Sequence, residues 1–187
     1  MKIRDIAAAI EEFAPLSLQA DFDNSGLIVG RMDDEVHAAL LAVDVTEEVL
    51  DEAEREGCDI IITHHPIIFT PLKRLNSANY VERCVERAIR KGIALYACHT
   101  NLDSAANGMS WQVGSMIGLD AMTVLEPRKC DPTVGYGVVG ILPRPEEIMS
   151  LLGRIKRIFD VGAVRYSDLP EEGMMVRRVA ICTGAGR

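Results

Sequence analysis

The sequence lacks any hydrophobic run long enough to cross a membrane. A membrane-spanning helix needs about 20 mostly apolar residues, and each apolar run in these 187 residues is shorter. Glu11 and Glu12 interrupt the segment where a signal peptide would carry its apolar stretch. The sequence therefore predicts a protein that is neither exported nor inserted in a membrane.

Cysteine is sparse and shows no pairing pattern. The five cysteines are odd in number, and none belongs to a CxxC motif. This distribution argues against a disulfide scaffold and against a zinc ribbon. Because most of them lie within apolar runs, we expect buried, reduced thiols in a cytoplasmic protein.

Basic residues are fewer than acidic ones. Lys and Arg together number 20 against 28 Asp and Glu, for a formal net charge of −8. An acidic chain repels the phosphate backbone, which disfavours general nucleic-acid binding. Lys73 and Arg74 form a small basic patch that either meets a small anion or is simply a solvated loop.

A dinucleotide fingerprint is also missing. Gly26 and Gly30 lie in DFDNSGLIVG, but the segment lacks the GxGxxG spacing and does not follow a predicted strand. We interpret it as a tight turn into a short strand, with Asp23 or Asn24 capping the turn or lining a site.

What the sequence does contain is an alternation of amphipathic segments and short apolar runs, with 48% hydrophobic residues overall. The periodicity predicts helices at 2–14, 46–57, 78–91 and 106–117, and buried strands at 38–44, 58–63 and 93–98. Helical connections return the chain to the same side of a sheet. We therefore expect a three-layer α/β/α fold with a mainly parallel or mixed sheet.

After Gly118 the pattern is looser. It predicts strands at 134–141, 161–166 and 175–182, a helix at 145–159 and a turn at 168–173. We divide the chain into a first half, 1–120, and the start of a second half, 121–187. The TGAGR segment after the last strand is typical of a turn into a helix, so the second half is expected to be incomplete.

Polar side chains follow two of the predicted strands. THHPIIF follows the strand at 58–63, and ACHTNLDSAANG overlaps the end of the strand at 93–98. Ligands bind at the carboxyl ends of strands in open α/β sheets, and consecutive strands are neighbours about two-thirds of the time. We therefore expect His64, His65, His99 and Asp103 to converge at one edge of the sheet.

These residue types favour a divalent metal. Imidazole and carboxylate donors select Zn, Fe, Mn or Co over Ca. Side chains alternate along an extended backbone, so His64 and His65 are expected to point to different sides and to serve two ions. Asp103 would complete or bridge the pair, and two ions about 3.5–4 Å apart activate a water molecule.

Ordinary interpretations compete with this prediction. A lone pair of adjacent histidines is more often not a ligand pair. His99 is a metal ligand, a residue behind the ligands, a proton shuttle or a core histidine, and we favour a position behind the ligands or a role in proton transfer over ligation. Asp44 either reaches the same edge or caps a helix beside Thr46. His37 precedes a strand and is predicted to lie on the surface.

The four segments FDNSGLIVG, LLAVDVT, ITHHPIIF and HTNLDSAANG, in this order within residues 1–120, resemble the GTP cyclohydrolase 1 type 2 homolog family. Its members are also described as dinuclear-metal-centre hexameric proteins. The resemblance implies two similar interlinked α/β halves, a homohexamer and two divalent cations (Zn, Fe, Mn or Mg) per complete subunit. It assigns His64, His65 and Asp103 as metal ligands.

The family takes two further ligands from a later HxxxE segment, which this sequence does not contain because His99 is its last histidine. This form is thus expected to bind one ion, two ions weakly or none. The resemblance implies a metal-dependent hydrolase acting on a nucleotide or other small molecule, with His99 as proton shuttle. The alternative is a non-enzymatic metal-binding hexamer that stores or delivers metal or binds partners.

Overall fold

The computed structural model describes residues 1–168 and 173–184. The chain forms two compact units, Met1–Ala105 and Ala106–Arg187. This division lies upstream of residue 120, because the helix at Met109–Ile117 packs on the sheet of the second unit: Ile117 shares a core cluster with Leu142 and Leu151. Within the described residues, no helix has the length and apolar character needed to span a membrane.

The first unit is built on a four-stranded mixed sheet with the order β1-β4-β3-β2. Strands β2, β3 and β4 are parallel to one another, whereas β1 pairs with β4 in the antiparallel sense. The strands are β1 (Gly26–Val29), β2 (Ala39–Ala42), β3 (Ile60–Thr63) and β4 (Ala94–Ala97).

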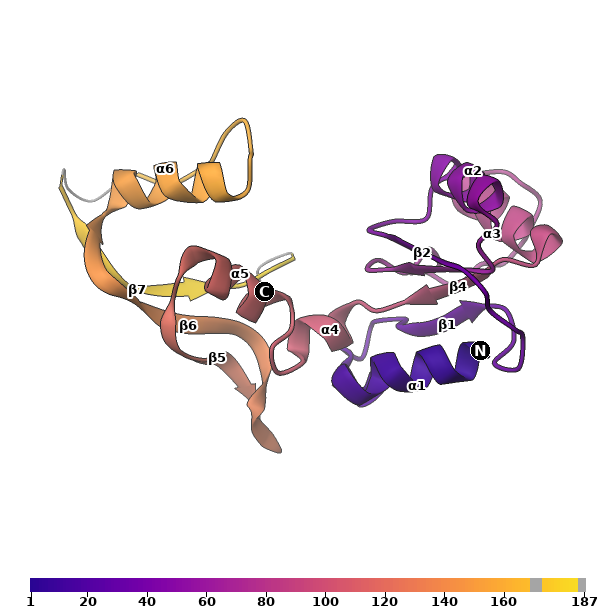
Figure 1. The fold of residues 1–187 in the computed structure, drawn as a ribbon, viewed down its shortest axis with the longest axis horizontal. Coiled ribbons are helices and arrows are strands. Elements are labelled where there is room, and N and C mark those ends of the chain that lie inside the picture. Colours follow the sequence, from indigo (N-terminus) through magenta and orange to yellow (C-terminus); the bar gives the residue numbers. More distant parts are fainter. Residues whose placement is uncertain (169–172, 185–187) are drawn as a thin grey trace. The chain divides into compact units, whose positions relative to one another are not determined.

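Helices cover both faces of this sheet (Figure 1). Helix α1 (Ile3–Phe13) packs on one face, and α2 (Glu47–Glu56) and α3 (Tyr80–Lys91) pack on the other. A short 3₁₀ turn, η1 (Leu16–Leu18), follows α1, and the short helix α4 (Thr100–Ser104) follows β4. The three-layer α/β/α arrangement with a mixed sheet is the one that the sequence predicted.

Local sequence signals set the ends of α2 and α3. The side chain of Thr46 accepts a hydrogen bond from the backbone N–H of Val49 at the start of α2, and Asn79 does the same for Glu82 in α3. Both helices end at a glycine in the left-handed conformation, where a side chain would be strained. The predicted bounds of these helices are therefore confirmed to within two residues.

Strand β3 runs through the middle of the core. Side chains alternate between the two faces of a strand, so Ile60 packs in the cluster under α1 while Ile61 packs in the cluster under α2 and α3. Neither side chain is exposed. Cys58, Cys84 and Cys98 are also buried, as predicted, whereas Cys130 is exposed.

The second unit contains an antiparallel sheet with the order β5-β6-β7. Its elements are α5 (Met109–Ile117), β5 (Asp120–Arg128), β6 (Asp131–Glu147), α6 (Ile148–Ile158) and β7 (Met175–Ile181). The strand predicted at 161–166 is wrong, because these residues form no regular element. The turn predicted at 168–173 falls mostly outside the described residues.

Helix α6 begins three residues later than predicted. The sequence placed its start at Pro145, but β6 continues through this residue to Glu147. The pairing of β6 with β7 is irregular between Ile141 and Glu146. Proline has no backbone N–H to donate, so it is tolerated at such an interruption of a sheet. Glu147 then caps the helix by accepting a hydrogen bond from the backbone N–H of Ser150.

Candidate metal centre

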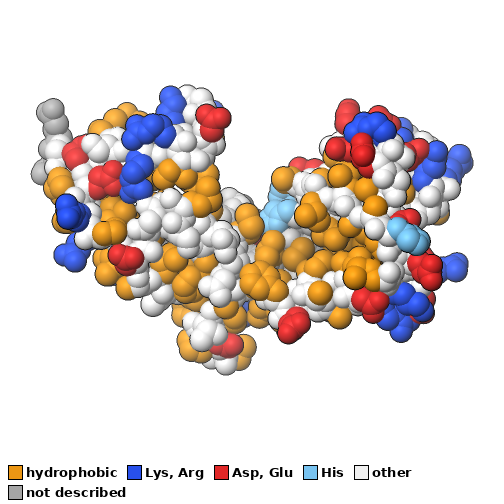
Figure 2. Space-filling model, in the orientation of Figure 1, with side chains coloured by type: hydrophobic (Ala, Val, Ile, Leu, Met, Phe, Trp, Pro, Cys, Tyr) orange, Lys and Arg blue, Asp and Glu red, His pale blue; other side chains and the backbone are white. Residues whose placement is uncertain are grey.

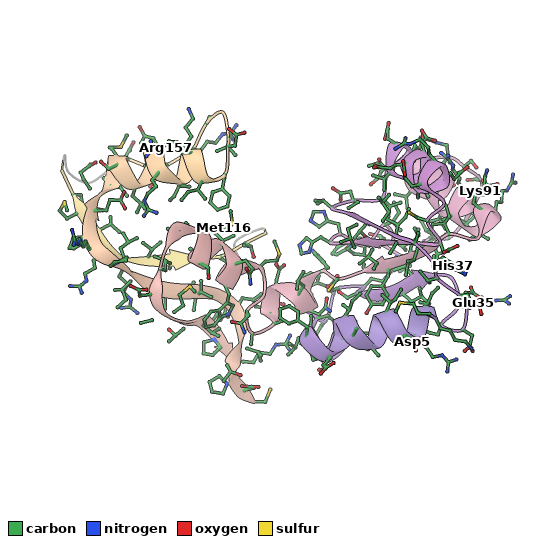
Figure 3. The ribbon with its side chains drawn as sticks, in the orientation of Figure 1. Asp5, Glu35, His37, Lys91, Met116 and Arg157 are labelled. Atoms are coloured by element: carbon green, nitrogen blue, oxygen red, sulfur yellow. The ribbon has the colours of Figure 1, made fainter. Side chains whose placement is uncertain are left out.

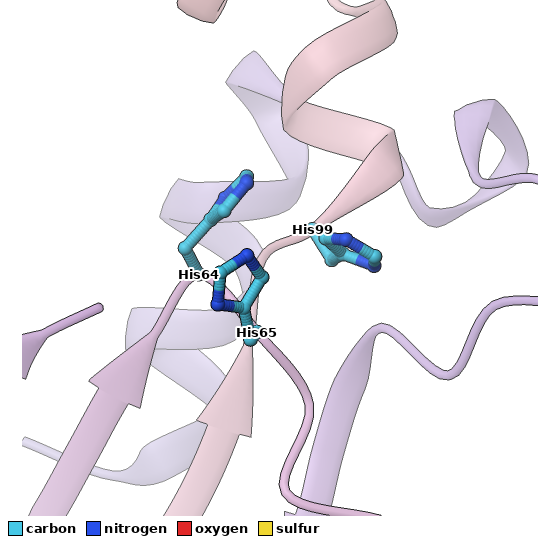
Figure 4. Close-up of side chains that lie close together, drawn as sticks. All are labelled: His64, His65 and His99. Atoms are coloured by element: carbon cyan, nitrogen blue, oxygen red, sulfur yellow. The ribbon is translucent and has the colours of Figure 1, made fainter. Parts of the chain in front are cut away.

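The candidate site lies at the carboxyl ends of β3 and β4. These strands are parallel neighbours, and their last residues, Thr63 and Ala97, are paired. The segments that follow them therefore leave the sheet at the same edge. This places His64 and His65, after β3, next to His99, after β4 (Figure 4).

The three imidazole rings form a close group. Their ring centroids are 4.9 Å apart for His64 and His65, 5.2 Å for His64 and His99, and 5.5 Å for His65 and His99. One ring nitrogen from each lies within 4.8 Å of the others. This spacing allows the three nitrogens to face a common small volume.

The adjacent pair does not diverge as an extended backbone would require. The chain bends after Thr63, whose hydroxyl donates a hydrogen bond of 2.8 Å to the carbonyl oxygen of His65. Because of this bend, the rings of His64 and His65 lie close together. The expectation that they point to different sides of the chain assumed a strand that ends two residues later.

Each imidazole is held at its Nδ1 atom by a partner that only accepts hydrogen bonds. The pairs are His64 with the carbonyl oxygen of Cys98 at 2.9 Å, His65 with Asp44 Oδ1 at 2.8 Å, and His99 with Asp23 Oδ1 at 2.8 Å. A neutral imidazole that donates from Nδ1 keeps its lone pair on Nε2. In this arrangement the lone pair of each Nε2 atom is available to coordinate a metal ion or to accept a proton.

Asp103 adds a carboxylate at the margin of this group. It lies on α4, and its Oδ2 atom is 4.0 Å from His64 Nε2. Its side chain is only 12% exposed. The structure therefore brings together all four residues that the sequence singled out, with the three histidines as the tightest cluster.

The electrostatics favour neutral imidazole at His64. Burial lowers the pKa of His64, and the neighbouring rings of His65 and His99 lower it further, against the opposing effects of Asp103 and the Cys98 carbonyl. A metal ligand must be unprotonated, so a lowered pKa helps metal ions to compete with protons near neutral pH.

Two aspartates complete the surroundings of the cluster. Thr46 caps α2, and Asp44 contacts His65 instead, which resolves the two interpretations of Asp44. Asp23 lines the site. Burial alone would raise the pKa of Asp23, but hydrogen bonds led by those from Thr100 and His99 lower it to about 2. Sequence reasoning left both aspartates open because neither lies near its histidine in the chain.

His37 lies apart from this group. It precedes β2, at the opposite end of the strands, and its side chain is 78% exposed (Figure 3). Histidine accordingly appears at two separate places on the surface of the first unit (Figure 2). The prediction that His37 is a surface residue is confirmed.

The donor set suits a borderline divalent metal ion. Imidazole nitrogens with a nearby carboxylate match the preferences of Zn, Fe, Mn and Co, whereas Ca prefers oxygen donors alone. Metal-ligating histidines usually donate their second ring N–H to a carboxylate or carbonyl, and all three rings do so here. The residues therefore fit a metal of this class.

Fold and site define an α/β protein with a histidine cluster at the carboxyl edge of its sheet. The sequence model of the Duf34/NIF3 (NGG1p interacting factor 3) family matches residues 1–187, so the chain belongs to that family. A GTP cyclohydrolase 1 type 2 homolog from Clostridium acetobutylicum is 34% identical over the whole of this chain and 69% of its own length. NIF3-like protein 1 from Bos taurus is 28% identical over 98% of this chain and 50% of its own.

Solved structures show the same fold. Staphylococcus aureus protein SA1388 superposes with a TM-score of 0.91 at 26% identity, covering the whole of this chain and 73% of that protein. Reduced HcgD from Methanocaldococcus jannaschii gives a TM-score of 0.72 at 31% identity, covering 84% of this chain and 60% of that one. The family resemblance and the α/β fold that the sequence predicted are thus confirmed.

Proposed function

We propose that the cluster at the ends of β3 and β4 binds divalent metal cations, with His64, His65 and Asp103 as ligands. The observation that carries the proposal is the convergence of three imidazole rings, each of which is held at its Nδ1 atom by a hydrogen-bond acceptor. Three donors are fewer than the four to six that each ion needs, so water or further donors would complete the coordination.

The reaction that we propose for this centre is hydrolysis. A divalent cation there would lower the pKa of a water molecule towards about 7. His99 would take up a proton at Nε2, since its Nδ1 atom is bound to Asp23. Several relatives are called GTP cyclohydrolase 1 type 2 homologs, so GTP is the first substrate to test. The proposal includes a homohexamer in the cytoplasm, as the resemblance implies.

Metal binding is tested by calorimetric titration of the metal-depleted protein with Zn²⁺. We expect the wild type to bind Zn²⁺ and His64→Ala to lose about 100-fold or more in affinity. Loss of a residue that hydrogen-bonds to a metal ligand already lowers metal affinity by about 10–100-fold, and loss of the ligand itself should cost at least as much. His37→Ala is the matched control, because it removes an exposed imidazole at the far end of the strands. Equal affinities of the wild type and His64→Ala would refute the assignment.

Hydrolysis is tested separately by formate release from GTP in the presence of Zn²⁺, Mn²⁺ or Fe²⁺. We expect metal-dependent release that His64→Ala abolishes and His37→Ala leaves unchanged. Zinc binding without turnover on a panel of nucleotides would instead favour the non-enzymatic alternative, in which the protein stores or delivers metal or binds partners.

A further inference from the structure

The carboxylate of Asp23 is the centre of a covered hydrogen-bond network. Its side chain has no exposed surface. It accepts hydrogen bonds from the backbone N–H of Asn24 at 2.7 Å, the hydroxyl of Ser25 at 2.9 Å, the backbone N–H of Thr100 at 3.0 Å, the hydroxyl of Thr100, and Nδ1 of His99 at 2.8 Å. A carboxylate with this many donors around it is held in one orientation.

The same network also holds the backbone of His99. The N–H of His99 donates to the hydroxyl of Ser25 at 3.3 Å, and Ser25 in turn donates to Asp23. Both the main chain and the ring of His99 are therefore tied to the segment that precedes β1. The ring itself is 18% exposed, so it keeps access to the cluster and to solvent.

An acceptor at Nδ1 selects one of the two neutral forms of an imidazole. Free histidine can carry its proton on either nitrogen, and the hydrogen bond made by one nitrogen decides the state of the other. Asp23 already accepts hydrogen bonds from four groups other than His99, so it is an acceptor in this site. A neutral His99 must then donate from Nδ1 and leave Nε2 without a proton.

We propose that Asp23 is a positioning residue that holds His99 with its proton on Nδ1 and leaves the Nε2 lone pair of this ring free beside His64 and His65. The inference rests on the proposed function, because an unprotonated Nε2 can accept a proton from a water molecule or hydroxyl group that reacts at the site. Asp23 acts only through His99 and is not itself a ligand. This role explains why a fully covered carboxylate lies behind an otherwise solvent-accessible ring.

The substitution Asp23→Asn tests the proposal. Asn is the same size, but its amide nitrogen would donate to Nδ1 of His99 and so move the imidazole proton to Nε2, the exchange that this substitution produces in hydrolase triads. Long-range ¹H–¹⁵N correlation spectra of histidine-labelled protein, recorded over a range of pH that extends into the neutral form, distinguish the two forms directly. The spectrum of His99→Gln assigns the signal.

We expect a protonated Nδ1 and a bare Nε2 in the wild type, and the reverse in Asp23→Asn. Asp21→Asn, which removes an exposed carboxylate two residues away, is the control and should leave the His99 signals in place. A proton on Nε2 in the wild type, or the same form in wild type and Asp23→Asn, would overturn the proposal. If Asp23→Asn fails to fold, the wild-type spectrum still decides.

A zinc titration separates this proposal from the proposed function. Because His99 is not assigned as a ligand, the affinity of Asp23→Asn for Zn²⁺ should lie within about tenfold of the wild-type value. Tenfold is the smallest loss of metal affinity that is typical when a residue hydrogen-bonded to a metal ligand is replaced. A larger loss would make His99 a ligand and overturn its assignment as a proton acceptor. If the wild type binds no zinc, the proposed function fails, but the spectra of the metal-free protein still test the orientation of His99.

Discussion

Asp23 should make the first unit sensitive to acid. Its pKa of about 2, against 3.8 for an unperturbed aspartate, corresponds to about 2 kcal/mol of stabilisation. A carboxyl whose pKa is lower in the folded state contributes fully above its unfolded pKa, here above about pH 5. The contribution is lost as the pH falls towards 2, and about half of it should be gone by pH 3.

The substitution Asp23→Asn isolates this contribution from those of the other carboxylates. We expect the variant to be less stable than the wild type at pH 7. The difference in free energy of unfolding should then shrink by about 1 kcal/mol between pH 5 and pH 3, because only the wild type loses the charge. Asp21→Asn, at an exposed position nearby, should follow the wild-type curve.

Urea denaturation of metal-free protein, followed by circular dichroism at several pH values, measures these differences. Fluorescence would not serve, because the single tryptophan, Trp111, lies on α5 in the second unit and does not report on Asp23. A difference between wild type and Asp23→Asn that stays constant from pH 7 to pH 3 would refute the argument that hydrogen bonds to the charged form dominate at Asp23.

Two further predictions concern the scaffold. Leu50→Ala should lower the free energy of unfolding by about 2–5 kcal/mol, because Leu50 is fully buried between α2 and the sheet; urea denaturation measures this, and a loss below 1 kcal/mol would contradict it. Gly30→Ala should cost more than Gly57→Ala. Both have positive φ, but a Cβ at Gly30 would lie 2.9 Å from that of Ala94, whereas Gly57 faces open space. Equal melting temperatures of the two variants would show that the contact does not matter.

Much of the first unit followed from local patterns. The signals that define a helix act over that helix alone, so they can be recognised in the sequence. In α2 these signals are the apolar periodicity, the capping residue Thr46 and the terminating Gly57. The second unit was harder to predict. Strand β5 was missed. Strand β6 runs past Pro145 because Glu146 and Glu147 pair with β7, a distant contact that the local helix signal does not reveal.

The sequence by itself determined the chemical types at the site and their position at strand ends: His64, His65, His99 and Asp103 all follow buried strands. Only the tertiary structure decided how each ring is held. The partners of the three Nδ1 atoms lie 34, 21 and 76 residues away along the chain. A hydrogen bond requires its two atoms to lie about 3 Å apart in space. The sequence does not show which distant residues meet this condition, so the partner of each ring is known only from the folded structure.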